Sequence, residues 1–176
     1  MKIMSINLRP LKIIGVMILV VLMLSFMLVF SSSQTVYFGY TVRQVPIYYV
    51  KTDEKKVAIS FDAAWGADKT SDIIKICQDY DIKATFFLVG FWVNEYPEKV
   101  KEIFDAGFDI GTHSNTHPQM SKLTSTQITE ELTTSCNLIT NITGQKVRFF
   151  RPPYGDYNDL LLTTAQNLGL QTIQWS

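Results

Sequence analysis

The sequence predicts an α/β fold in which helices cover a parallel β-sheet that curves into a barrel. Short apolar runs recur from Val57 onward, and each is followed by a loop and a stretch with helical spacing. Runs that are apolar on both faces are typical of strands buried under helices. No glycine-rich phosphate loop follows the first run, and polar residues instead collect just past several strand ends. This pattern favours a barrel over a dinucleotide-binding sheet.

The N-terminal residues are expected to form a membrane segment. Lys2, Arg9 and Lys12 precede an uncharged apolar run of eighteen residues, Ile13 to Phe30. At about 1.5 Å per residue this run nearly spans a hydrocarbon core of roughly 30 Å. The flanking positive charges predict a cytoplasmic N-terminus and an exported remainder, anchored by a single pass in the cell membrane. The small residues at 31–33 leave open a cleaved signal peptide, which would make the protein secreted.

Three regions are therefore expected along the chain. Residues 1–33 are the anchor or signal segment, residues 34–56 a linker and β-hairpin, and residues 57–176 a globular domain. Strands are predicted at five runs of that domain, namely "VAISF", "ATFFLV", "FDIGT", "VRFF" and "QTIQW". A complete barrel usually needs about 200 to 250 residues, so five strands make this one incomplete at its C-terminus.

Helices are predicted between these strands. The first lies around residues 73–80, where apolar residues have helical spacing. The second begins at Pro97 and stops before Gly107, positions that suit proline and glycine at helix ends. The third begins at a capping box of Thr124 and Gln127 and is ended by Gly144. The last covers residues 161–168.

Composition limits the classes of function. The chain has 176 residues, no formal net charge and 47% hydrophobic residues, which suits one folded domain. No basic stripe indicates binding to DNA or RNA, so nucleic acid is not expected as a partner.

The only two histidines, His113 and His117, lie four positions apart in "THSNTHPQ". Pro118 disfavours a helical conformation at His117, which places the pair on a loop. A loop can direct two neutral imidazoles at one metal ion, and imidazole is a preferred zinc ligand. The alternative is a pair of histidines that are hydrogen-bonded within a polar loop.

A carboxylate and a guanidinium are expected beside the histidines. Asp62 ends the first strand and Arg151 follows the fourth, so a bidentate hydrogen bond would hold the aspartate ionised. An aspartate, an arginine and a metal pair in one cleft form a hydrolytic set, in which the aspartate takes the proton of a water. The rigid turn after Arg151 would direct the backbone N–H of Tyr154 toward an oxyanion. The alternative is a structural salt bridge.

Three ordered motifs, "SFDAAWG", "HSNTHP" and "RPPYG", resemble those of polysaccharide deacetylases with the NodB homology domain, carbohydrate esterase family 4. The forms "RPPYGDYND" and "IQWS" look most like its sporulation-associated branch. The resemblance implies a distorted (β/α)7 barrel that removes N-acetyl groups from peptidoglycan or chitin-like glycan. It also implies Asp62 as catalytic base, His113 and His117 as metal ligands, Arg151 as the residue that orients Asp62, and Tyr154 as the oxyanion donor.

Two departures from the family pattern stand out. In the family a second aspartate follows the catalytic one and is the third metal ligand, but Ala63 stands at this position. A divalent metal, for which zinc is the first candidate, is therefore expected to bind weakly or not at all. Asn115 and Asp68 are candidate substitutes. The family's general acid also has no counterpart, since no histidine follows His117, and little turnover is expected from this chain.

The leading hypothesis is a membrane-anchored glycan deacetylase, acting as a monomer on N-acetylated polymer. Trp65, Tyr154 and Tyr157 are candidates for stacking on sugar rings, although core or rim packing explains them equally well. The alternative is a lapsed enzyme that binds wall glycan without deacetylating it, a reading that Ala63 favours.

Overall fold

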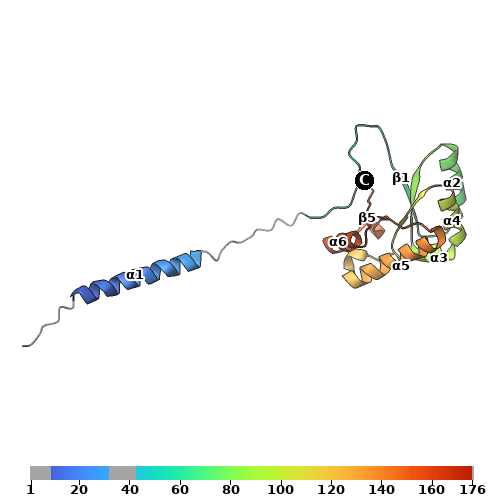
Figure 1. Ribbon diagram of the computed structural model, residues 1–176. Helices are drawn as coiled ribbons and strands as arrows, with labels where there is room; N and C mark the ends of the chain where they lie inside the picture. Colours follow the sequence, from blue (N-terminus) through green and yellow to red (C-terminus); the bar gives the residue numbers. More distant parts are fainter. Residues whose placement is uncertain (1–8, 32–42, 176) are drawn as a thin grey trace, which may run out of the picture. The chain divides into compact units, whose positions relative to one another are not determined.

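The computed structural model describes residues 9–31 and 43–175, which fall into two units, Met1–Val42 and Arg43–Ser176 (Figure 1). In the first unit, helix α1 covers Arg9–Ser31. Its side chains are described at residues 14–27, and over the described residues no helix is long and apolar enough to cross a membrane. The predicted span of residues 13–30 extends past both ends of that range, and the serines at 32 and 33 lie outside the described residues.

The second unit holds a parallel sheet of five strands, as the sequence predicts. The strands follow one another in chain order, β1-β2-β3-β4-β5. Their bounds are β1 Ile59–Ala63, β2 Ala84–Leu88, β3 Asp109–Thr112, β4 Phe149–Phe150 and β5 Gln171–Thr172. Right-handed crossovers between strands in this order keep their helices on one side of the sheet, as in the wall of a barrel. The completed seven-stranded barrel stays a prediction.

Helices separate the strands along the chain (Figure 1). Their bounds are α2 Thr70–Asp79, α3 Gly90–Glu95, α4 Pro97–Asp105, α5 Ser125–Thr143 and α6 Asp159–Asn167, with short 3-10 helices η1 Met120–Lys122 and η2 Pro153–Gly155. Four of these were expected from sequence. Helix α3 was not, because six residues are too few to display helical periodicity.

The core lies between the sheet and the helices. Strand β2 is buried along nearly its whole length, with Phe86 and Phe87 almost fully enclosed. Helix α5 contributes Ile128, Leu132 and Ile139, whose spacing places them on one face, and it contacts α3, α4 and α6. The sheet is thereby covered, and the ends of its strands remain free to hold polar groups.

The predicted β-hairpin over residues 34–56 does not form in the described part of that range, residues 43–56. This segment makes instead a single parallel bridge from Ile47 to Ile173, just past β5. The Ile47 N–H donates to the Thr172 carbonyl, and the Gln174 N–H donates to the Ile47 carbonyl. Ile47 therefore pairs with a distant strand end, a tertiary contact that the local sequence pattern does not reveal.

Gly144 gives a direct test of how α5 ends. It has φ 70° and ψ 0° at the helix end, and an added Cβ would meet no atom within 4 Å. Gly144→Ala is therefore expected to lower the free energy of unfolding by about 1 kcal/mol through backbone strain alone. Gly144→Asn, which tolerates this conformation better, should lose less. Urea unfolding of both variants measures the difference, and equal losses would contradict the explanation.

Candidate active site

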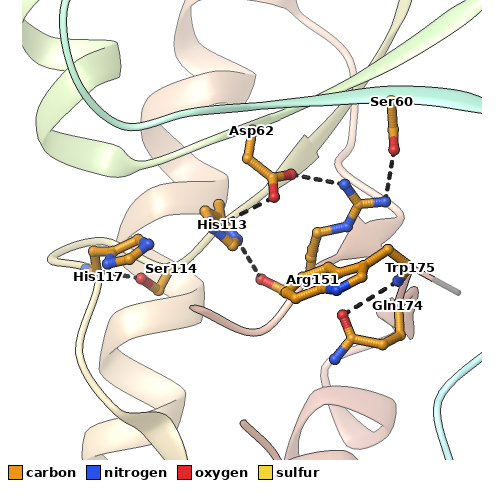
Figure 2. Close-up of polar contacts among 8 residues, drawn as sticks. All are labelled: Ser60, Asp62, His113, Ser114, His117, Arg151, Gln174 and Trp175. Atoms are coloured by element: carbon orange, nitrogen blue, oxygen red, sulfur yellow. Dashed lines mark hydrogen bonds and ion pairs between the residues drawn. The ribbon is translucent and has the colours of Figure 1, made fainter. Parts of the chain in front are cut away.

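The predicted site residues come from the carboxyl ends of three strands of one parallel sheet, β1, β3 and β4. Asp62 lies in β1, His113 follows β3, and Arg151 follows β4. Because ends of parallel strands meet at one edge of a sheet, these residues converge although 89 positions separate Asp62 from Arg151. Figure 2 shows their side chains facing one another. The predicted convergence is confirmed.

Arg151 holds Asp62 through one oxygen only. Its Nη1 donates to Asp62 Oδ1 at 2.8 Å, and its side chain is 6% exposed against 33% for Asp62. Its Nη2 donates to Ser60 Oγ, also at 2.8 Å. The expected bidentate pair is therefore wrong, because a serine two residues before Asp62 accepts from the second arm. The guanidinium also lies over the ring of Phe87, 4.0 Å from its centroid.

His113 is buried and neutral. Its Nδ1 lies 2.7 Å from the Arg151 carbonyl oxygen, which can only accept, so Nδ1 carries the proton and Nε2 is bare. Burial lowers the pKa of His113, and this outweighs the opposing effect of Asp62. The bare Nε2 lies 3.9 Å from Asp62 Oδ2. Two acceptors thus face each other across a gap that a proton donor or a cation would bridge.

The lowered pKa of His113 predicts acid sensitivity. The unfolded chain takes up a proton near the ordinary value of about 6.5, and the folded chain does so only at lower pH. The contribution of His113 to the free energy of unfolding should therefore be complete above pH 6.5 and should decrease as the pH falls below it. His113→Asn, which does not titrate, should lose less stability between pH 7 and pH 5 in thermal unfolding. Equal losses would assign the acid sensitivity to other groups.

The loop between the histidines is held in an uncommon conformation. Ser114 and His117 have φ of 71° and 58°, and Ser114 Oγ accepts from the His117 N–H. The carboxylate of Glu131, on α5, accepts from the N–H groups of Asn115 and Thr116, each at 2.8 Å. Positive φ at such residues costs about 1 to 3 kcal/mol and persists only where surrounding contacts hold it. These hydrogen bonds therefore stabilise the loop conformation. No sequence pattern indicated that Glu131 contacts this loop, because the fold brings α5 beside it.

The two imidazoles lie close together, as a metal site would need. Their ring centroids are 5.0 Å apart, and His117 Nδ1 is buried without a partner among the described residues. That unpaired nitrogen and the unprotonated Nε2 of His113 are atoms of the type that coordinates zinc.

Within residues 9–31 and 43–175, no third protein ligand joins the two histidines. Over the described residues, no group of three His, Cys, Asp or Glu side chains is arranged to hold a metal. The candidate Asp68 is instead highly exposed beside Lys69, and the amide oxygen of Asn115 lies against Gly90, where an added Cβ would stand 2.1 Å away. Catalytic zinc takes three protein ligands. The residues present therefore do not fit a complete zinc site, and the weak metal binding expected from Ala63 stays a prediction.

Two of the three predicted aromatic residues flank His117. The Tyr154 ring packs edge-on against the imidazole with centroids 4.7 Å apart, and the Trp65 ring lies 6.4 Å from it. Both remain open to solvent, at 62% and 79% exposure. Tyr157 is directed elsewhere, because its hydroxyl lies 3.2 Å from that of Tyr48 in the N-terminal segment of this unit.

Comparison with known proteins gives consistent results. A family model described as polysaccharide deacetylase matches residues 49–173. The chain is 32% identical over 130 residues to the peptidoglycan-N-acetylmuramic acid deacetylase PdaA of Bacillus subtilis, covering 73% of this chain and 49% of that protein. Its fold is similar to that of a CE4 family pseudoenzyme from Bacillus anthracis, with a TM-score of 0.72, 39% identity, and coverage of 74% of this chain and 47% of the other.

A mutant CE4 family pseudoenzyme described as having restored enzymatic activity matches equally well. The TM-score is 0.72 at 40% identity, with 74% of this chain and 48% of the other covered. The chain spans less than half the length of the first curated relatives that it matches.

Proposed function

Because the chain belongs to the polysaccharide deacetylase family, we propose that it is a hydrolase that removes N-acetyl groups from cell-wall glycan, either peptidoglycan or a chitin-like polymer. The observation that carries the proposal is the carboxylate of Asp62. Arg151 engages one of its oxygens, and the other faces the bare Nε2 of His113. The name of the relative from Bacillus subtilis, a peptidoglycan-N-acetylmuramic acid deacetylase, supports the substrate class.

The residues of the site have complementary roles in this reaction. A water that donates to Asp62 Oδ2 and to His113 Nε2 sits in the gap between them, and Asp62 takes its proton. The oxygen attacks the acetyl carbonyl carbon, the proton held by Asp62 passes to the nitrogen, and the C–N bond breaks to give acetate and a free amine. The backbone N–H of Tyr154 is proposed to stabilise the oxyanion. No step is assigned to a metal, because the donor set is incomplete.

The exposed rings at the mouth of the site are suited to a polymer. Trp65 and Tyr154 flank His117 and offer apolar faces to solvent. Sugar rings present C–H faces that pack on aromatic side chains, so these two residues are proposed to hold the glycan.

Acetate release from acetylated peptidoglycan or chitin oligomers tests the proposal. Asp62→Asn keeps the size of the side chain and removes the base, so release should fall by about 100-fold or more. Asp81→Asn makes the same change of charge at a position with φ 51°, outside the site, and should leave release unchanged. Equal release from the Asp62→Asn variant and the unaltered chain would refute Asp62 as the base.

A second function is favoured by Ala63. Without a carboxylate at this position, the described residues supply no third ligand. A solved structure of similar fold is named as a pseudoenzyme. The second proposal is a protein that binds wall glycan through the same cleft without deacetylating it. Retention on insoluble peptidoglycan with no acetate release would support this function over hydrolysis.

The location of the protein is also a proposal. The apolar run of residues 13–30, with Lys2, Arg9 and Lys12 at its N-terminal side, supports a single-pass anchor with the catalytic unit outside the cytoplasm. Protease treatment of intact cells should then degrade the unit and leave the N-terminus protected. A soluble, protease-resistant protein in the cytoplasmic fraction would contradict the anchor. The sporulation-associated branch stays a prediction from the motifs.

A further inference from the structure

We propose that Ser60 is a positioning residue, whose hydroxyl engages one arm of Arg151 and thereby keeps one oxygen of Asp62 free for a water. The inference rests on the proposed function of this site and deepens it. Ser60 is not among the expected catalytic residues. In this proposal it determines which of two hydrogen-bonding patterns the Arg151–Asp62 ion pair adopts.

The geometry places both acceptors on one face of β1. Ser60 and Asp62 are two residues apart in a strand, so their side chains point the same way. The two arms of the Arg151 guanidinium divide between them, with Nη1 on Asp62 Oδ1 and Nη2 on Ser60 Oγ, both at 2.8 Å. Figure 2 shows the guanidinium spanning the two side chains.

This division is not the default for such a pair. Arginine and a carboxylate commonly form two parallel hydrogen bonds, since the fork of the guanidinium matches the two carboxylate oxygens. A bidentate pair here would engage Oδ2, the oxygen that lies 3.9 Å from His113 Nε2. Oδ2 would then accept from the guanidinium as well, which makes it a weaker base toward a water.

The surroundings of the guanidinium leave few other movements. Arg151 is 5% exposed, the ring of Phe87 lies 4.0 Å beneath the guanidinium carbon, and Trp175 lies 5.8 Å from it. Rotation within the plane of the guanidinium is the movement that a ring on its face permits. The Ser60 hydroxyl opposes that rotation by holding Nη2 away from Asp62.

A matched pair of variants tests the role. Ser60→Thr keeps the hydroxyl, and Ser60→Val has nearly the same shape without it. Crystal structures of both should show Arg151 bonded to one oxygen of Asp62 in the threonine variant and to both oxygens in the valine variant. Thermal unfolding of each confirms that the domain is folded.

Kinetics with an acetylated glycan oligomer provide the second readout. We expect kcat of the valine variant to fall by about 10-fold while KM changes less than twofold, and the threonine variant to match the unaltered chain. An unchanged single bond to Asp62 in the valine variant, or equal kcat in both variants, would overturn the inference. If no form of the chain releases acetate, hydrolysis as the proposed function fails, and the crystal structures alone decide the effect of Ser60 on Asp62.

Discussion

Ala63→Asp is expected to increase the zinc affinity of the chain by about 100-fold. The binding free energy of structural zinc is about 10 to 16 kcal/mol over four ligands, or roughly 3 kcal/mol for each ligand. A gain of about 3 kcal/mol corresponds to about two orders of magnitude in the dissociation constant. The position is suited to supply a ligand. Ala63 is paired in register with Leu88, and the Leu88 carbonyl accepts from the N–H of His113. A carboxylate at 63 would thus join the edge of the sheet that holds the histidines.

Competition with a zinc chelator of known affinity measures this effect. Ala64→Asp places the same charge one residue later, beyond the end of β1, and should gain little. Adding His117→Ala to the Ala63→Asp variant should remove most of the gain, because the ion again has two protein ligands. Equal affinity in the variants at 63 and 64 would show that the carboxylate acts only as a nearby charge.

The strands and the meeting of Asp62 with Arg151 were predictable because they follow from local pattern and one rule of parallel sheets. Apolar runs marked the five strands, and each polar residue just past a run had to lie at the same edge. The capping box at Thr124 and the glycine at 144 likewise act within a few residues of sequence. Signals of this kind are contained in the sequence itself.

Contacts that depend on tertiary distance were not predictable. Ser60 meets Arg151 across 91 residues, and Glu131 meets Asn115 across 16. Neither residue type is unusual where it stands in the sequence. The bidentate pair expected for Asp62 and Arg151 was wrong for the same reason, since the competing acceptor becomes visible only when strand and arginine are placed together. The principal residues of this site could therefore be identified from the sequence, but their side-chain partners only from the three-dimensional structure.

Asp62→Ala is expected to lower the free energy of unfolding by about 2 kcal/mol. The change leaves the buried guanidinium of Arg151 with Ser60 and without a counter-charge, and breaking a buried ion pair costs about 3 to 5 kcal/mol. The cost here should be smaller because Asp62 is 33% exposed, which lets water screen the remaining charge. Asp62→Asn, which retains an acceptor for Arg151, should lose about 1 kcal/mol.

A double-mutant cycle in urea separates the charge effect from lost packing. Arg151→Met removes the charge and keeps much of the apolar stem, so the double variant with Asp62→Ala should be more stable than the sum of the single losses predicts. We expect a coupling of about 1 to 2 kcal/mol between the two positions. Strict additivity would mean that the pair contributes through packing alone.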